Sequence, residues 1–398
     1  MGGTEMNEWK KVKLGELCDF INGGAWSDKE YASEGIPVLK VTNCKNTGFA
    51  LEDLSYLPYS LQQKYSQNEL RLHDVIIATV GSHPNLVNSS AGRSIIVNSL
   101  VIGFYLNQNA VCIRTKDSNI LNQLYLGYYS KYYIFQNYIQ MRGKGAANQM
   151  RIAISSIKDY PMPLAPIEKQ NYIAIILSRY DSLIENYQKQ IKLLEEASQR
   201  LYKEWFVDLH FPGYENTKIV DGVPDGWKPS ILGQLSEFKR GKTITKKEVV
   251  DGPIPVVAGG LEPAYYCNKS NTAERVITVS GSGANAGFTR IYFEKVWASD
   301  CSYVDKVTTS YLHFVYCFLK DNKTVIDNMQ KGAAQPHVYA KDINLMELCI
   351  PTESMLKSFE EKATKFFDTI CALQYQIRLL TEARDRLLPK LMSGEIIV

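Results

Sequence analysis

IKLLEEASQRL (191–201) and IRLLTEARDRL (377–387) are two versions of one segment, 186 positions apart. Around both copies, apolar residues recur at alternating spacings of three and four, the heptad pattern of helices that pack along a seam. Two long helices with the same seam are therefore expected. Pairing them antiparallel within the chain is the economical way to bury both seams, and the alternative is that each stripe packs on its own domain.

The two helices are expected to start at acidic residues. Asp181 and Asp368 could cap them, because a carboxylate accepts hydrogen bonds from unpaired backbone N–H groups. Twenty-odd helical residues then span roughly 36 Å. Pro389 should end or kink the second helix and leave Leu391 outside it. The expected seam residues are Ile184, Tyr187, Ile191, Leu194 and Leu201 in the first helix, and Ile370, Leu373, Ile377, Leu380 and Leu387 in the second.

A second landmark is repeated ahead of each helix. EWKKVKLGEL (8–17) returns as DGWKPSILGQL (225–235), with Trp9 and Trp227 separated by 218 positions instead of 186. The two halves therefore differ by 32 residues between these landmarks. A duplicated frame with unequal middles predicts one architecture that presents two different surfaces.

Composition indicates an ordinary globular protein. The 398 residues suit two to four domains, and 45% apolar with 22% charged residues is typical of that class. A net charge of +3 gives no bulk reason to expect a polyanion partner, although local patches could bind one. The eight cysteines are scattered without a CxxC pair, which favours reduced thiols over zinc or disulfides. No leader and no apolar run of about 20 residues is recognisable, so we expect a cytoplasmic protein.

Each half contains a mixed α/β region before its long helix. Short β-rich runs bounded by turn residues predict strands, longer apolar runs predict helices, and Pro166 suits the first turn of a helix. A stretch rich in Gly, Pro and Asp joins the halves and reads as a linker. The expected strands are 35–43, 74–81, 109–115, 254–260, 275–281 and 290–298, and the expected shorter helices are 125–141 and 311–321.

A search for catalytic motifs finds little. There is no GxxxxGK[ST] loop, no HExxH and no GxSxG, and the five histidines are isolated from one another and from the cysteines. VITVSGSGANAG (276–287) could be a cofactor loop, but β-like sequence follows it where pyrophosphate binding would need a helix. The matching VIIATVGSHPN (75–85) keeps the strand but not the glycine-rich run. A hairpin or surface loop is the better interpretation.

Both halves do carry polar loops that suit DNA contact. Gly-Ala-Ala followed by an amide residue occurs in both, at 145–149 and 332–335. Arg, Lys, Asn and Gln match base edges in the major groove, and Lys and Arg neutralise phosphates. Each loop taken singly could equally be a solvated turn. The candidates for DNA contact are Asn85, Asn88, Arg93, Arg142, Lys144, Asn148, Gln149 and Arg151 in the first half, and Arg240, Lys242, Asn285, Arg290, Lys331, Gln335 and His337 in the second.

The order of parts resembles the specificity (S) subunit of type I restriction–modification enzymes. The resemblance rests on the two passages beginning at Trp9 and Trp227, on the Gly-Ala-Ala-Asn-Gln to YPMPLAPIEKQ passage (145–170), and on the two helices. It implies an α+β fold in which two α/β target-recognition domains, in pseudo-twofold arrangement, are separated by two long antiparallel helices forming a coiled coil. The implied parts are a first target-recognition domain (9–165), a first helical region (166–207), a linker (208–226), a second target-recognition domain (227–352) and a second helical region (353–398).

The resemblance also implies function and partners. Each recognition domain would read one half of a bipartite double-stranded DNA target, and the helices would act as a ruler, since roughly 36 Å is close to one DNA turn of about 34 Å. Methyltransferase (M) subunits, usually two, would dock on the chain and hold S-adenosylmethionine. Restriction and translocase (R) subunits would bring ATP and Mg²⁺. This chain would bind no metal or cofactor and carry no active site, and the partners' methylation and cleavage would require it.

Two departures and several alternatives stay open at this stage. Leu348-Cys349-Ile350-Pro351-Thr352 replaces the proline-rich passage of the first half and lacks the Glu-x-Gln that follows it there, so partner docking could differ on the two sides. A type IIB-like specificity component is one alternative, and a duplicated coiled-coil adaptor that binds only protein is another. A stand-alone nuclease or methyltransferase would be active by itself, which we do not expect.

Overall fold

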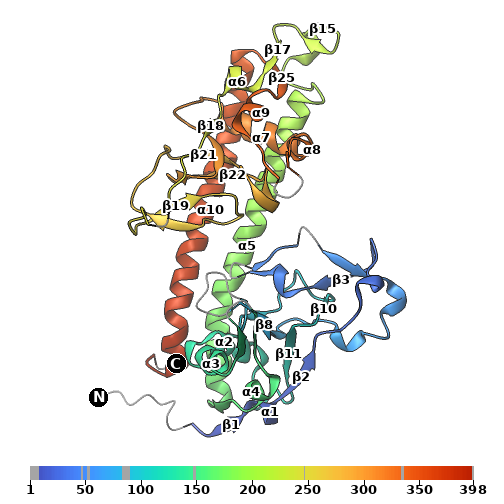
Figure 1. Cartoon of the computed structure of the whole chain (residues 1–398), viewed down its shortest axis with the longest axis vertical. Coiled ribbons are helices and arrows are strands. Elements are labelled where there is room, and N and C mark those ends of the chain that lie inside the picture. Colours follow the sequence, from blue (N-terminus) through green and yellow to red (C-terminus); the bar gives the residue numbers. More distant parts are fainter. Residues whose placement is uncertain are drawn as a thin grey trace. The chain divides into compact units, whose positions relative to one another are not determined.

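The structure is a computed structural model that describes residues 9–45, 48–51, 54–82, 90–146, 149–245, 247–332 and 336–396. The chain forms two compact units, Met1–Ile184 with Arg378–Val398, and Glu185–Ile377. Each unit combines a mixed α/β part with one stretch from each of two long helices, α5 (Ile167–Phe206) and α10 (Glu353–Ser393) (Figure 1). The fold is α+β, as the sequence predicts.

The long helices start earlier than expected. α5 has 40 residues and α10 has 41, so each is about 60 Å long at 1.5 Å per residue. α5 begins directly after Pro166, as predicted, but the expected starts at Asp181 and Asp368 and the 36 Å length are wrong. Burial explains the extension: Ile173, Ala174 and Leu177, ahead of Asp181, pack in the core of the first unit.

Pro389 does not end the second helix, so the expectation that Leu391 lies outside it is wrong. Pro389 lies inside α10, which continues to Ser393. A proline this close to a helix end removes one of the last backbone hydrogen bonds and disturbs little of the helix. Leu391 is buried with Leu388 and Met392 in the core of the first unit, and this packing holds the final turn.

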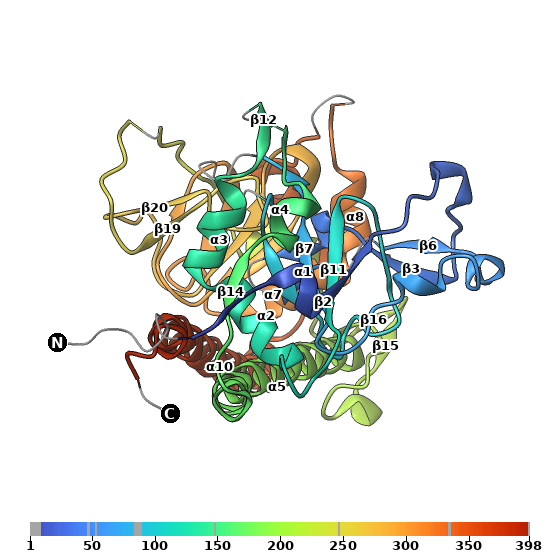
Figure 2. The ribbon, with the colours of Figure 1, turned by 90° about the horizontal axis from the view of Figure 1, so that it is seen from below.

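Within each unit the two helix stretches run antiparallel. In the first unit, Leu391 belongs to the same core cluster as Ile173, and Arg384 donates a hydrogen bond to Asp181. Residue numbers therefore increase along α5 in the direction in which they decrease along α10. In the second unit, Tyr202 packs on Phe359, and the partly buried Leu194 packs on the cluster that contains Ile370. Figure 2 shows α5 and α10 side by side.

The α/β part of the first unit is built on a four-stranded antiparallel sheet of order β2-β11-β7-β9. A smaller sheet, β10-β3-β6, pairs β10 parallel and β6 antiparallel to β3. β1 pairs with β14. Their bounds are β1 Lys11–Lys13, β2 Cys18–Asn22, β3 Ile36–Leu39, β6 Ser55–Leu57, β7 Val75–Ala78, β9 Ser94–Ile96, β10 Tyr105–Leu106, β11 Ala110–Thr115 and β14 Pro161–Pro163. The helices are α1 Leu14–Leu17, α2 Gln123–Lys131, α3 Tyr133–Gln140 and α4 Ile154–Lys158.

The second unit repeats this plan strand for strand. Its main sheet is β18-β24-β21-β22, its smaller sheet is β20-β19-β23 with β19 and β23 parallel, and β17 pairs with β25. Their bounds are β17 Lys228–Ile231, β18 Lys239–Arg240, β19 Ile254–Val257, β20 Tyr265–Cys267, β21 Val276–Ser280, β22 Thr289–Tyr292, β23 Trp297–Ala298, β24 Cys301–Asp305 and β25 Glu347–Ile350. The helices are α6 Leu232–Leu235, α7 Leu312–Asp321, α8 Lys323–Asn328 and α9 Ala340–Asn344.

Short strands also pair in the expected linker and elsewhere in the first unit. The expected linker holds the hairpin of β15 (Ile219–Val220) and β16 (Val223–Pro224). In the first unit, β4 (Cys44–Lys45) pairs with β5 (Gly48–Phe49).

Two expected elements are divided in the structure. The helix expected over 125–141 breaks at Tyr132, which has an extended backbone and is 2% exposed, so that α2 and α3 both pack on the core. The strand expected over 290–298 is two strands, because the chain leaves the main sheet after Tyr292 and joins the smaller one at Trp297. The glycine-rich stretch after β21 is a hairpin connection to β22, as predicted.

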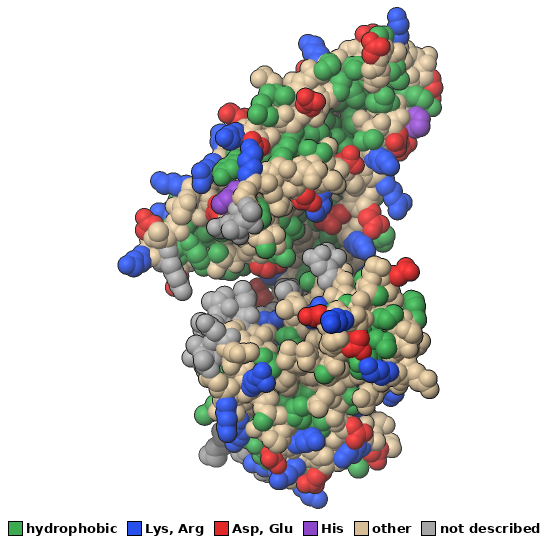
Figure 3. Space-filling model, turned by 45° about the vertical axis from the view of Figure 1, so that its right-hand side comes forward, with side chains coloured by type: hydrophobic (Ala, Val, Ile, Leu, Met, Phe, Trp, Pro, Cys, Tyr) green, Lys and Arg blue, Asp and Glu red, His purple; other side chains and the backbone are tan. Residues whose placement is uncertain are grey.

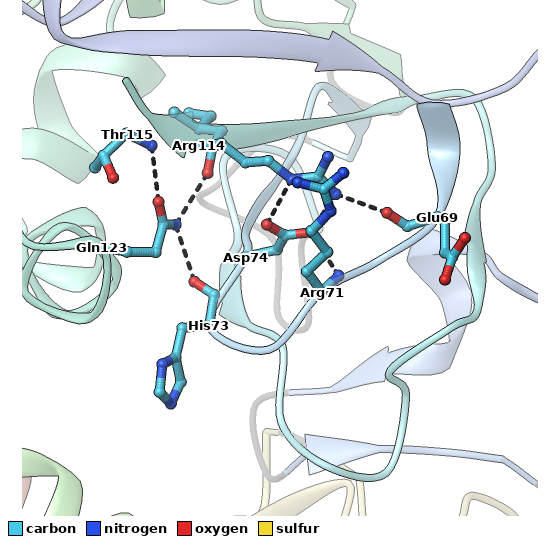
Figure 4. A network of polar contacts seen from close by, with 8 residues as sticks. Glu69, Arg71, His73, Asp74, Arg114, Thr115 and Gln123 are labelled. Carbon is cyan, nitrogen blue, oxygen red and sulfur yellow. Dashed lines mark hydrogen bonds and ion pairs between the residues drawn. The ribbon is translucent and has the colours of Figure 1, made fainter. Parts of the chain in front are cut away.

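A buried polar network fixes the main sheet of the first unit (Figure 4). Asp74 accepts a hydrogen bond from Arg114 at 2.6 Å, and only 3% of its side chain is exposed. Gln123, at the start of α2, donates to the carbonyl oxygens of His73 and Ile113 at 2.9 and 3.1 Å. These bonds join the beginning of α2 to the two central strands of the sheet, in β11 and just ahead of β7, where unpaired polar groups would otherwise be buried at a cost.

Candidate nucleic-acid interface

The first unit carries a two-stranded ribbon formed by β12 (Lys144–Ala146) and β13 (Gln149–Arg151), and β13 also pairs with β8 (Val80–Gly81). Met150 is buried in the core, whereas Lys144, Gln149 and Arg151 are exposed. Successive strand side chains point to opposite faces, so the three polar side chains share the outer face. Figure 2 shows β12 beyond α3 and α4 at the margin of this unit.

Glycines allow this ribbon to form. Gly145 has a φ of +128°, a conformation that favours glycine. A Cβ atom at Gly145 would lie 2.3 Å from the carbonyl oxygen of Gln149, and one at Gly143 would lie 1.8 Å from the Met150 side chain. The Gly-Ala-Ala passage is therefore needed for the close approach of the two strands.

The second unit has a reduced version of the same ribbon. Lys331 pairs with His337 through two backbone hydrogen bonds of 3.0 and 2.9 Å, and His337 forms a bridge with Ser282. Lys331 occupies the place of Lys144, and His337 that of Arg151. Both carboxylate oxygens of Asp342 accept hydrogen bonds from Lys331 at 2.9 Å, so the charge of this lysine is balanced within the unit.

The other first-unit candidates behave differently from the ribbon residues. Arg93 is half-buried and donates to the carbonyl oxygen of Cys44, and burial lowers the pKa of its guanidinium. Arg142 is exposed but stacks 3.5 Å above the Tyr138 ring and donates to the Tyr138 carbonyl at 3.0 Å. Asn85, Asn88 and Asn148 lie outside the described residues.

Among the second-unit candidates, the structure brings one group of loops together. Asn285 lies in the hairpin between β21 and β22, whose Gly283 donates to the Pro336 carbonyl next to His337. Lys242 is exposed in the loop after β18, and Arg240 is exposed at the end of that strand. Gln335 lies outside the described residues.

Arg290 is the second-unit candidate least available for DNA. Its guanidinium donates to the Leu261 carbonyl at 2.9 Å, lies 3.6 Å from Glu262 and sits 4.9 Å over the Tyr292 ring. These partners, like Asp342 beside Lys331, were not found from the sequence. No local spacing links Glu262 to a residue 28 positions further on, so only the folded sheet reveals the contact.

Charge is mixed over the surface that Figure 3 shows, where Lys and Arg side chains alternate with Asp and Glu. This agrees with the small net charge of +3. Any contact with a polyanion must therefore depend on local cations such as Lys144 and Arg151. In the described ranges there is no group of three or more His, Cys, Asp or Glu side chains that could hold a metal ion, and none of their helices is both long and apolar enough to cross a membrane.

All ten expected seam residues of α5 and α10 are buried or half-buried. Ile184, Ile370 and Leu373 are buried. The others are half-buried, namely Tyr187, Ile191, Leu194, Leu201, Ile377, Leu380 and Leu387.

The chain matches a family model twice, over residues 6–196 and 224–376. That model describes the type I restriction modification DNA specificity domain. The chain belongs to this family. The two matched segments correspond to the two copies of the repeated frame, which explains why one chain contains the same sheet order twice.

Relatives of this specificity family carry similar names. The chain is 28% identical over 269 residues to the type I restriction enzyme MjaIX specificity subunit of Methanocaldococcus jannaschii, a match that covers 61% of this chain and 62% of that one. It is 21% identical to the putative type I restriction enzyme MjaX specificity subunit of the same organism, covering 99% and 95%. The crystal structure of a type I restriction–modification S subunit from M. genitalium matches with a TM-score of 0.56 at 17% identity, covering 98% and 97%, and shows the shared fold.

Proposed function

We propose that this specificity-family chain is the non-catalytic DNA-recognition subunit of a type I restriction–modification complex, in which residues 9–165 and 227–352 are target-recognition domains that each read one half of a bipartite target. One observation carries the proposal. The same frame is built twice, yet the exposed Arg151 that faces Lys144 in one ribbon is replaced by the half-buried His337 that faces Lys331 in the other. Unlike side chains on like frames suit unlike half-sites, because base-edge contacts specify sequence.

The helical regions, residues 166–207 and 353–398, are proposed to act as a ruler that sets the unread spacer, with residues 208–226 as the linker. Two facts support a rigid role. α5 and α10 are uninterrupted, and they pair antiparallel along buried side chains in both units. The length of the helices then fixes the length of the spacer. Lengthening or shortening both helices by whole turns should therefore change the spacer of the DNA target in steps.

Exposed residues that recur in both copies of the helix repeat support partner docking, because packing within the chain does not explain why they recur. Leu193 and Leu379 are equivalent in the repeat, and their exposures are 63% and 44%. Glu196 and Arg200, which recur as Glu382 and Arg386, lie beside Leu193 along a shallow groove with Phe366. Two like surfaces suit two copies of one partner. We assign them to methyltransferase subunits, which supply S-adenosylmethionine, and restriction subunits with ATP and Mg²⁺ would complete a cytoplasmic complex.

Methylation mapping tests the proposal. A host that carries this chain with its methyltransferase partner should acquire methylation at one bipartite motif, and deletion of the chain should abolish it. Purified complex should bind that motif with a steep decrease of affinity in salt, because DNA binding releases counterions. A protein-only adaptor would show neither result. Activity of the isolated chain with Mg²⁺ or S-adenosylmethionine would contradict the non-catalytic role.

A further inference from the structure

Among the residues that the structure describes, the ribbon of the first unit brings two cations together without a balancing carboxylate. Lys144 and Arg151 are direct partners in the β12–β13 register. Facing side chains in such a pair have Cβ atoms about 4.5–5.5 Å apart, and like charges placed there destabilise the pair. Across the described parts of the chain, neither cation has an acidic partner. A ligand that carries negative charge would relieve this repulsion.

Resting on the proposed function, we infer that this ribbon enters the DNA major groove of the first half-site, where Gln149 and Arg151 read base pairs two steps apart and Lys144 contacts a phosphate. The major groove is wide enough for a two-stranded ribbon. Gln149 and Arg151 alternate with the buried Met150, so both point outward from the same strand.

The spacing of the strand sets the spacing of the bases. Residues two apart along a strand are separated by about 6.6 Å, and base pairs two steps apart are separated by about 6.8 Å along the helix axis. A strand that runs along the groove therefore keeps both side chains in register with bases. Arg pairs bidentately with guanine and Gln with adenine. Lys144, a flexible point charge, suits a phosphate.

The second unit supplies a matched comparison. Lys331 has the same place in the frame as Lys144 and is exposed, with 58% of its side chain accessible, but Asp342 holds it at 2.9 Å from both carboxylate oxygens. Its charge is already balanced, so it should release fewer counterions when DNA binds. Two exposed lysines in equivalent places can therefore be compared, one of them held by a carboxylate and the other facing a second cation.

The test uses the complete chain assembled with its methyltransferase partner and duplexes that carry its mapped target. Arg151→Ala and Gln149→Ala are each measured against a panel of single base-pair substitutions. Lys144→Ala and Lys331→Ala are measured over a range of salt concentrations. Lys144, Gln149 and Arg151 lie on the outer face of the first ribbon, and Lys331 is exposed in the second unit, so none of the four substitutions removes a buried side chain. Circular dichroism of each complex verifies folding.

Each recognition variant should lose about 5- to 150-fold of discrimination at one base pair, and the two affected positions should lie two steps apart in the same half-site. Lys144→Ala should weaken binding to all duplexes alike and reduce the slope of log affinity against log salt by about 1. Lys331→Ala should change that slope by less.

Three results would overturn the inference. The first is unchanged base preference in both Gln149→Ala and Arg151→Ala while the wild-type complex remains sequence-specific, which leaves the proposed function intact. The second is a pair of affected positions that are not two steps apart or that fall in different half-sites. The third is a wild-type complex without any sequence preference, which overturns the proposed function as well.

Discussion

Arg384 donates a hydrogen bond of 2.5 Å to Asp181 and so joins α10 to α5 inside the first unit. Tyr128 of α2 donates to the other oxygen of the same carboxylate at 2.7 Å. Burial alone would lower the pKa of Arg384, but Asp181 and Asp385 outweigh it and raise that pKa, so the side chain stays charged. In the other copy of the repeat this position is Ser198, whose hydroxyl donates to the Glu195 carbonyl of its own helix at 2.8 Å. One polar contact can fix the register of paired helices.

Replacing Arg384 with the residue of the other copy tests this contact. Arg384→Ser should lower the free energy of unfolding by about 1–3 kcal/mol, between the values for exposed and buried ion pairs, because it leaves Asp181 only partly satisfied. Arg200→Ser is the control, since Arg200 is 84% exposed and lies 3.9 Å from Glu196. Urea unfolding measures both. Equal effects of the two substitutions would show that the contact does not stabilise the helix pair.

Periodicity alone predicted the paired helices but placed their starts wrongly. The seam of Ile184, Ile191 and Leu194 is visible in sequence because each residue follows the heptad, whereas residues 167–180 contact the α/β part and follow its shape instead. Asp181 is a residue type that often caps helices, but it lies inside α5, where its carboxylate accepts hydrogen bonds from the distant Tyr128 and Arg384. Interactions far apart in the chain leave no local signal.

Glu360 of α10 stabilises the start of α7 in the second unit. Its carboxylate accepts hydrogen bonds from the backbone N–H groups of His313 and Phe314 at 3.2 Å each, and lies 2.8 Å from the His313 ring. The residue before α7, Tyr311, provides no side-chain cap. Glu360→Ala should therefore destabilise the protein by about 1–3 kcal/mol, since it leaves buried donors unpaired.

Glu361→Ala is the matched control for Glu360, because Glu361 is the next residue on α10 and is exposed. Thermal and urea unfolding should leave this control close to the wild type. If Glu361→Ala were as destabilising as Glu360→Ala, the loss of a negative charge from α10, and not the loss of the hydrogen bonds to α7, would explain the effect. Glu360→Gln should restore part of the stability, because its amide oxygen can still accept one bond.

In the first unit, Gln170 performs the corresponding function from α5. It is fully buried and accepts a hydrogen bond from the Asn122 backbone at 2.9 Å, while it donates to the carbonyls of Ile120 and Ala165. The Glu-x-Gln difference between the halves is thus a difference in how each long helix holds the α/β part of its unit.

The polar loops of the sequence correctly indicated that Lys144, Gln149 and Arg151 are exposed. The sequence could not indicate that Asp342 forms an ion pair with the candidate Lys331, or that Glu262 lies beside the candidate Arg290.

Asp305 should make the second unit sensitive to acid. Burial opposes ionisation of this carboxyl, but hydrogen bonds from Ala273 and Thr308 outweigh burial and lower its pKa. A carboxyl whose pKa is lower in the folded state contributes stability above its unfolded pKa of about 3.9, and this contribution is lost as pH falls below that value.

Asp305→Asn should therefore cost about 1.5–3 kcal/mol at pH 7, and its deficit relative to the wild type should shrink near pH 3. Urea midpoints at the two pH values provide the measurement. Asp251→Asn, at an exposed position in the same unit, is the control and should show no such pH-dependent difference. A deficit that stays constant with pH would show that packing, not ionisation, explains the Asp305 effect.

The repeated exposed leucines predict how partners assemble. Leu193→Glu and Leu379→Glu each place a charge in an apolar contact surface, whose desolvation is unfavourable unless the charge is paired. Each single variant should bind one methyltransferase subunit where the wild type binds two, and the double variant should bind none, as light scattering of the purified complexes would measure. Val307→Glu is the control, because Val307 is 80% exposed but has no repeated counterpart on the helices. If the double variant still binds two methyltransferase subunits, these surfaces are not the docking sites. If a single variant loses both subunits, the two docking positions are not independent.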